Sequence, residues 1–219
     1  MCGGTLMENR AKKINSSINQ NAIIRIIPGH FVTNHSHINY YVDMTIMKSR
    51  KSEAEAAASV LARKYSTSTY IDTIICMDGC EVIGAYLADE LTKSGIMSLN
   101  QHQTMYVVSP EMNPGGQLIF RDNMQMMIRG KHCLLLLASA TTGRTIARAV
   151  ECVQYYGGIM EGVAALFSAS EQVGGLEINY IFGKEDLEDY QTYDASKCPM
   201  CAKKEKIDAI VNSYGYSKL

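Results

Sequence analysis

The sequence predicts an α/β fold in which a mainly parallel β-sheet is covered by helices on both faces. Short β-rich segments alternate with helical segments of about 10 to 15 residues, which is the pattern of βαβ units. Residues 133–137 are almost wholly apolar, as expected of a strand that is buried on both faces. Residues 134–150 run from this strand through a loop of small residues into a helix.

The first part of the chain is predicted to hold two helices separated by an apolar stretch. Residues 6–22 carry a loose helical pattern and are predicted to form an N-terminal helix. Residues 23–32 are apolar. Residues 52–64 are rich in alanine, a strong helix former, and Ser52 with Glu55 three residues later predicts a capping box at the start of this helix.

The remaining elements follow in alternation. The predicted strands are residues 70–76, 104–108, 133–137, 160–167 and 177–182, and the predicted helices are residues 82–93, ending near Gly95, and 145–156. The connections at residues 77–81 and 109–116 are predicted loops because of their glycine and proline content. We predict three regions: an N-terminal helix and hood (1–45), a core (46–185) and a C-terminal tail (186–219).

The composition limits the classes of function. The chain has 219 residues, 47% of them hydrophobic and 20% charged, which is typical of a folded globular protein. The net charge of −1 argues against a broad nucleic-acid surface. No apolar run approaches the roughly 20 residues of a membrane span, and the N-terminus has no secretory pattern, so we expect a cytoplasmic protein without a membrane partner. The odd number of cysteines, seven, argues against a disulfide framework.

The loop that follows the apolar strand is the strongest candidate for a ligand site. The predicted phosphate-binding residues are Ser139, Ala140, Thr141, Thr142, Gly143, Arg144 and Thr145. The unpaired N–H groups and dipole of a helix N-terminus attract phosphate, and the threonine hydroxyls add donors. The alternative is an ordinary strand-to-helix turn with a threonine cap.

With these motifs, the sequence resembles the type I phosphoribosyltransferases, most closely the orotate phosphoribosyltransferases. The resemblance rests on four segments in the same order as in the family: residues 31–43, 70–91, 134–150 and 196–203. It implies a small N-terminal hood over the strand ends, Mg²⁺ as cofactor, a homodimer, and a phosphoribosyl pyrophosphate or nucleotide ligand in pyrimidine biosynthesis.

The resemblance also implies two further sets of site residues. The pyrophosphate loop would be Met77, Asp78, Gly79, Cys80 and Glu81. The base would contact His35, Ser36, His37, Tyr40 and Tyr41. Two carboxylates in a pyrophosphate loop would repel phosphate without an intervening Mg²⁺ ion, and the alternative for Asp78 and Glu81 is an acidic helix start.

The sequence departs from the family where the chemistry occurs, and no catalytic residue can be assigned. Leu137 and Ala138 stand where the family has an acidic pair, and the flexible loop at residues 107–116 contains no cation and one carboxylate, Glu111. Residues 167–170 lack the arginine that contacts orotate in the family. Two hypotheses therefore remain: an active glycosyltransferase that acts on orotate, or an inactive ligand-binding or regulatory relative that keeps the 5′-phosphate site.

The sequence contains two groups of candidate metal ligands. His30, His35 and His37 are ligand types, but their spacing fits no zinc pattern. Cys198 and Cys201 form half of a zinc site, and no second CxxC follows them. A structural zinc site needs four ligands, so the sequence alone argues against zinc and leaves this cysteine pair as a weak candidate.

Overall fold

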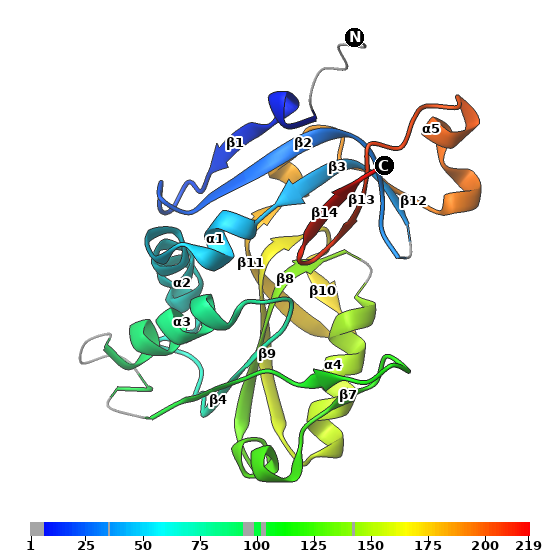
Figure 1. The fold of residues 1–219 in the computed structure, drawn as a ribbon. Coiled ribbons are helices and arrows are strands. Elements are labelled where there is room, and N and C mark those ends of the chain that lie inside the picture. The colour runs from blue at the N-terminus through cyan, green and yellow to red at the C-terminus, as the bar shows by residue number, and fades with distance from the viewer. Residues whose placement is uncertain (1–6, 35, 94–98, 102–103, 142) are drawn as a thin grey trace.

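The chain folds into a central sheet with a second sheet, the hood, above its strand ends (Figure 1). This computed structural model describes residues 7–34, 36–93, 99–101, 104–141 and 143–219. The central sheet has the order β10-β11-β9-β8-β4-β5. Its strands are β4 (Thr73–Cys76), β5 (Tyr106–Val108), β8 (His132–Ala140), β9 (Ile159–Ser168), β10 (Gln172–Val173) and β11 (Leu176–Gly183). All pairs are parallel except β10 with β11, which confirms the predicted sheet.

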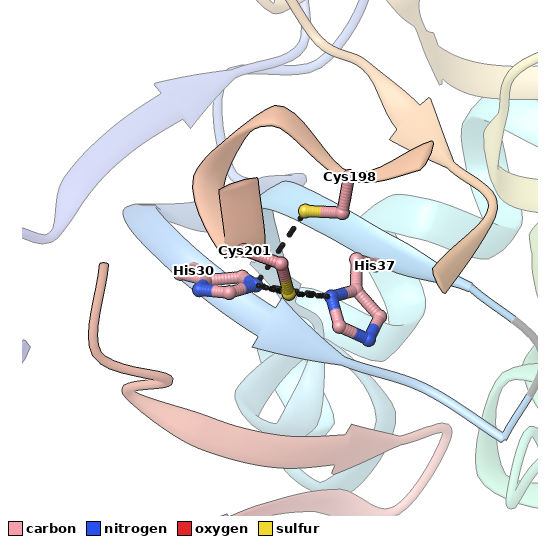
Figure 2. A group of neighbouring side chains, drawn as sticks. All are labelled: His30, His37, Cys198 and Cys201. Atoms are coloured by element: carbon pink, nitrogen blue, oxygen red, sulfur yellow. Dashed lines mark hydrogen bonds between the residues drawn. The ribbon is translucent and has the colours of Figure 1, made fainter. Parts of the chain in front are cut away.

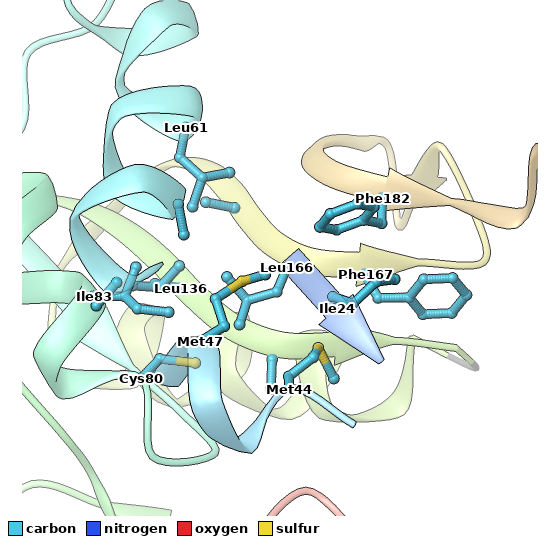
Figure 3. Packing of buried hydrophobic residues seen from close by; sticks show 14 of the residues in the cluster. Ile24, Met44, Met47, Leu61, Cys80, Ile83, Leu136, Leu166, Phe167 and Phe182 are labelled. Atoms are coloured by element: carbon cyan, nitrogen blue, oxygen red, sulfur yellow. The ribbon is translucent and has the colours of Figure 1, made fainter. Parts of the chain in front are cut away.

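Helices cover both faces of this sheet, also as predicted. On one face, α2 (Lys51–Tyr65) and α3 (Glu81–Lys93) pack on Leu134 and Leu136 of β8. On the other face, α4 (Arg144–Tyr155) packs on Leu135 and Leu137. Successive side chains of a strand point to opposite faces, so the apolar run in β8 serves both cores. Figure 3 shows the first core, in which Ile24 of the hood also takes part.

The hood combines strands from both ends of the chain, which lie side by side in Figure 1. Its strands are β1 (Lys12–Asn15), β2 (Ile23–Val32), β3 (His37–Asp43), β12 (Thr192–Tyr193), β13 (Ala209–Asn212) and β14 (Gly215–Lys218). The order is β12-β3-β2-β13-β14. Strand β1 pairs with the first residues of β2, whereas β13 pairs with its last two. Helix α1 (Thr45–Ser49) leads from the hood into the core. The C-terminal tail is therefore an integral part of the hood.

The predicted N-terminal helix over residues 6–22 is wrong for the part that the structure describes. A 3₁₀ turn, η1 (Met7–Arg10), precedes β1, which pairs antiparallel with β2. A turn follows β1, in which the side chain of Asn15 donates to the carbonyl of Gln20. Pairing with a buried strand gives this segment more stabilisation than an isolated short helix would have.

Two smaller predictions also need correction. Helix α2 begins at Lys51, with Arg50 as N-cap and no side-chain cap hydrogen bond, and Ser52 donates to Glu53 instead of capping the helix. The predicted loop at residues 109–116 contains β6 (Glu111–Met112), which forms a hairpin with β7 (Leu118–Ile119). The predicted helix end at Gly95 lies outside the described residues.

The short elements complete the chain. They are η2 (Asp122–Met127), η3 (Lys184–Asp186), η4 (Ala195–Lys197) and α5 (Pro199–Ala202). None of the helices in the described part of the chain is long and apolar enough to cross a membrane.

Candidate functional site

A cavity of about 330 Å³ is lined by loops at the carboxyl ends of the central strands and by the hood. From the core, its lining residues are Asp78, Met112, Ser139, Thr141, Arg144, Thr145, Arg148 and Phe167. From α1, the hood and the tail, they are Thr33, Asn34, Ser36, Ile38, Tyr40, Tyr41, Val42, Met44, Thr45, Tyr190, Val211, Asn212 and Ser213. Ligands of open α/β sheets bind outside the carboxyl ends of the strands, so this cavity is the candidate site.

The predicted phosphate turn connects β8 to α4 at the edge of this cavity. Gly143 is the N-cap of α4 and has a φ of 72°, in the left-handed region that favours glycine. A Cβ atom at this position would lie 2.6 Å from Cγ1 of Val173, so a larger residue has no room. Gly143 has no side chain to cap α4, so the N-cap residue does not compete with an anion for the first N–H groups of this helix.

The turn residues divide into those that line the cavity and those that support it. Ser139, Thr141, Arg144 and Thr145 line it. Ala140 is buried, and its carbonyl accepts a hydrogen bond from the N–H of Ala169. Thr142 lies outside the described residues.

Arginines on α4 supply the positive charge of the site. Arg144 and Arg148 both line the cavity, and within the described residues neither forms an ion pair. The sequence prediction omitted Arg148, although its spacing of four residues from Arg144 places both on one helix face. By contrast, Arg121 is held by Glu111 of the β6–β7 hairpin, with two N···O distances of 2.8 Å.

In the predicted pyrophosphate loop, Asp78 is the residue that lines the cavity. Asp78 and Gly79 have φ values of 59° and 75°, so the chain turns sharply here. Met77 and Cys80 are buried in the two cores. Glu81 begins α3 and accepts a hydrogen bond from the Ser109 hydroxyl at 2.7 Å.

Asp78 places a carboxyl group beside Ala138. Leu137 and Ala138 are the residues that stand where the resemblance implies an acidic pair. Burial raises the pKa of Asp78, while hydrogen bonds from the Ser213 side chain and the Ala138 N–H, together with the Lys48 ammonium, act in the opposite direction. Leu137 and Ala138 are themselves fully buried in the cores. Among the described residues that line the cavity, Asp78 carries the only carboxylate.

The hood side agrees only in part with the predicted base contacts. Ser36, Tyr40 and Tyr41 line the cavity, and burial raises the pKa of Tyr41 to about 12, which keeps its hydroxyl protonated. His37 is not among the lining residues. His35 lies outside the described residues.

The tail completes the wall with residues that sequence reasoning missed. Val211, Asn212 and Ser213 line the cavity because β13 pairs in parallel with β2. Phe167 and Tyr190 form an aromatic wall, with ring centroids 5.3 Å apart. No local sequence signal indicates these contacts, because they join segments that are distant in the chain.

His37 lies instead in a group with His30, Cys198 and Cys201 (Figure 2). Their nearest nitrogen and sulfur atoms all lie within 4.8 Å of one another. The two histidines come from β2 and β3, and the two cysteines come from α5 and the residue before it. His30, His37 and Cys198 are buried, and Cys201 is exposed.

Comparisons with known proteins agree with this architecture. No protein-family model and no curated protein sequence matches the chain. Among solved structures, a phosphoribosyltransferase from Corynebacterium diphtheriae is similar, with 18% identity, a TM-score of 0.52, and coverage of 83% of this chain and 94% of that chain. Orotate phosphoribosyltransferase from Aeropyrum pernix is also similar, with 19% identity, a TM-score of 0.53, and coverage of 74% of this chain and 90% of that chain.

A solved structure named for another base is also similar. Adenine phosphoribosyltransferase from Thermoanaerobacter pseudethanolicus has 15% identity, a TM-score of 0.51, and coverage of 81% of this chain and 97% of that chain. The likeness thus extends to enzymes named for different bases, and at such low identity it establishes the fold alone. The chain has the fold of the type I phosphoribosyltransferases.

Proposed function

We propose that the protein binds a phosphoribosyl compound in this cavity, with the 5′-phosphate at the turn between β8 and α4. The observation that carries the proposal is that one cavity unites the N-terminus of α4, the arginines Arg144 and Arg148, and the carboxyl group of Asp78. A phosphate group needs donors and positive charge, while ribose hydroxyls need an acceptor. The two kinds of group lie on adjacent loops.

Mg²⁺ fits this arrangement as a partner of the ligand. Mg²⁺ is usually bound through one or two carboxylates together with substrate phosphates, and it keeps several waters. Asp78 supplies one carboxylate at the cavity wall. When bound, the ion would neutralise phosphate charge, so the ligand would bind next to Asp78 without repulsion.

The charges of the site favour binding over efficient group transfer. Transfer from phosphoribosyl pyrophosphate develops negative charge on the leaving pyrophosphate, and a lost stabilising donor typically costs about 2.7–4 kcal/mol. The β6–β7 hairpin offers Met112 to the cavity, and its Glu111 already neutralises Arg121. We therefore infer a binding or regulatory protein for a phosphoribosyl ligand.

A second candidate function is transfer of the phosphoribosyl group to orotate in pyrimidine nucleotide metabolism. One observation favours it: the carboxyl group of Asp78 lies beside Ala138, where a carboxylate could replace the missing acidic pair. The sequence resemblance and the fold make orotate the first base to test.

Titration calorimetry with ribose 5-phosphate, with and without Mg²⁺, tests the proposed binding. We expect saturable binding that weakens in Arg144→Ala and is unchanged in Arg129→Ala, because Arg129 lies outside the cavity. Equal affinity in both variants, or no binding by the wild type, would disprove the phosphate site.

A turnover assay separates the two functions. The protein is mixed with orotate, phosphoribosyl pyrophosphate and Mg²⁺, and the formation of orotidine monophosphate is followed. We expect binding without appreciable turnover. Turnover within the usual enzyme range of about 1–1,000 per second would favour the transferase instead.

A further inference from the structure

We propose that His30, His37, Cys198 and Cys201 bind one Zn²⁺ ion that fastens the C-terminal tail to the hood. This site is separate from the phosphoribosyl cavity, since none of the four residues lines that cavity. Two cysteines and two histidines are the ligand set of many structural zinc sites, and tetrahedral coordination by two sulfurs and two nitrogens is typical of zinc.

The fold brings the four ligand atoms together from segments far apart in the sequence. In the hood sheet, Val32 of β2 pairs with His37 of β3, and a register irregularity lies between Pro28 and Phe31 of β2. The ring nitrogens Nε2 of His30 and Nδ1 of His37 lie 3.0 Å apart, so the two imidazoles meet. Cys198 is the N-cap of α5, and Cys201 follows three residues later, on the same side of a single helical turn. Figure 2 shows the sulfur of Cys201 between the two imidazole rings and the sulfur of Cys198 directed toward His30.

Four of the distances between the ligand atoms are close to those of a tetrahedral site, and the others are within 4.8 Å. Sγ of Cys201 lies 3.3 Å from Nδ1 of His37 and 3.6 Å from Nε2 of His30, and Sγ of Cys198 lies 3.6 Å from the same Nε2. With Zn–S bonds of about 2.3 Å and Zn–N bonds of about 2.0–2.1 Å, neighbouring sulfur and nitrogen ligands lie about 3.5 Å apart. Nε2 of His30 and Nδ1 of His37 lie 3.0 Å apart, against about 3.3 Å between two nitrogen ligands of such a site. The two imidazole rings would therefore have to move apart only slightly to bind the ion.

An outer contact fixes one imidazole in the form that a metal requires. Nδ1 of His30 lies 3.1 Å from the backbone oxygen of Glu205, so this nitrogen carries the proton and donates it. Nε2 of neutral His30 then keeps its lone pair for a metal. Metal-binding histidines usually donate their second N–H to a carbonyl or carboxylate in this way.

The main alternative is that the four side chains are a metal-free polar cluster. In that case, the two imidazoles would share one hydrogen bond of 3.0 Å. The two thiols would have only S···N contacts of 3.3–3.6 Å, which are weak hydrogen bonds. A second alternative is a disulfide between Cys198 and Cys201. In that case, Nε2 of His30 and Nδ1 of His37 would have only their hydrogen bond to each other within this group.

The ion would stabilise the part of the hood that adjoins the cavity. His30 and His37 flank the segment that contains Thr33, Asn34 and Ser36, which line the cavity. The cysteines precede β13, whose end and following turn line the same cavity. A zinc ion here would therefore hold both segments in position without contacting the ligand.

The test is the metal content of the untagged protein, purified in reducing buffer without chelator and measured by plasma mass spectrometry. We expect one zinc per chain, and a Co²⁺-substituted protein with the visible absorption of tetrahedral thiolate coordination. Zinc far below one per chain after incubation with excess Zn²⁺ would overturn the proposal. So would an octahedral Co²⁺ spectrum, or loss of two titratable thiols to a disulfide under reducing conditions.

Variants identify the ligands. Cys201→Ser should lower zinc affinity by more than the 10–100-fold typical of a lost outer contact. Cys152→Ser is the matched control, because Cys152 donates to the carbonyl of Leu118, remote from the cluster, and should retain full zinc. Equal zinc in both variants would exclude the site. The measurement needs no phosphoribosyl ligand, so its result is independent of the proposed function.

Discussion

Lys48 donates from its ammonium nitrogen to the backbone oxygen of Asp78 at a distance of 2.7 Å. The same nitrogen donates to the backbone oxygen of Ser213 at 2.5 Å. One buried cation on α1 thus ties the sharply turned loop of the core to the turn between β13 and β14. It fixes two walls of the candidate site relative to each other.

Replacement of Lys48 by methionine should destabilise the protein. Methionine keeps the apolar packing but leaves two carbonyl oxygens without their charged donor, so we expect the free energy of unfolding to fall by about 2–3 kcal/mol. Urea denaturation measures this change. Lys51→Met is the control. Lys51 forms an exposed ion pair with Glu55 within α2, so its replacement should change stability little.

Substitution of Gly143 by alanine should damage the phosphate turn. The left-handed backbone costs alanine about 1–2 kcal/mol, and the contact with Val173 adds a steric term, so we expect a total loss of about 2–4 kcal/mol. Gly174→Ala is the control: Gly174 has a φ of 60°, and a Cβ atom there would meet no described atom within 4 Å. If both variants lose the same stability, the steric argument fails.

Removal of Arg148 should weaken binding of ribose 5-phosphate. A hydrogen bond to a charged group contributes about 1.5–3 kcal/mol, so Arg148→Ala should raise Kd roughly 10- to 100-fold. Arg121→Ala should leave Kd nearly unchanged, because Glu111 already holds that guanidinium. Calorimetry on both variants checks the difference, and a larger effect for Arg121 would place the ligand elsewhere.

Asp78 should make stability depend on pH. Burial raises its pKa above the ordinary value of 3.8, so the folded state binds the proton more tightly than the unfolded state. The free energy of unfolding should therefore decrease as pH rises from 3.8 through the higher pKa of the folded state.

Asp78→Asn removes this dependence and provides the check. The variant should gain stability over the wild type near neutral pH, and the gain should shrink as pH falls toward 3.8. It should also lose any strengthening of ligand binding by Mg²⁺. A variant that is less stable than the wild type at neutral pH, with Mg²⁺ dependence intact, would rule out both roles of this carboxyl group.

Much of the central fold could be predicted because its signals are local. The uninterrupted apolar run of β8 and the alternation of strands with helices specified a parallel sheet. The hood was less accessible: β1 was mistaken for part of a helix, since four residues give little periodicity and pairing with β2 decides their conformation. The predicted cytoplasmic location and homodimer stay predictions.

The candidate site was predicted in the same uneven way. Ser139, Thr141, Arg144 and Thr145 follow directly from the strand-turn-helix sequence, and all four line the cavity. Of the predicted base contacts, His37 belongs to the group with the two cysteines instead. Its neighbours along the chain gave no sign of this, because the face of a hood strand is decided by pairing.

The sequence by itself determined the order of the central strands and helices and the turn between β8 and α4, since periodicity, small residues and helix starts act over a few positions. Only the tertiary structure decided what surrounds them. It brought Cys198 to His30 across 168 positions and Lys48 to Ser213 across 165. Such contacts depend on how β13 pairs with β2 and how two cores pack, and neither is encoded in any short segment.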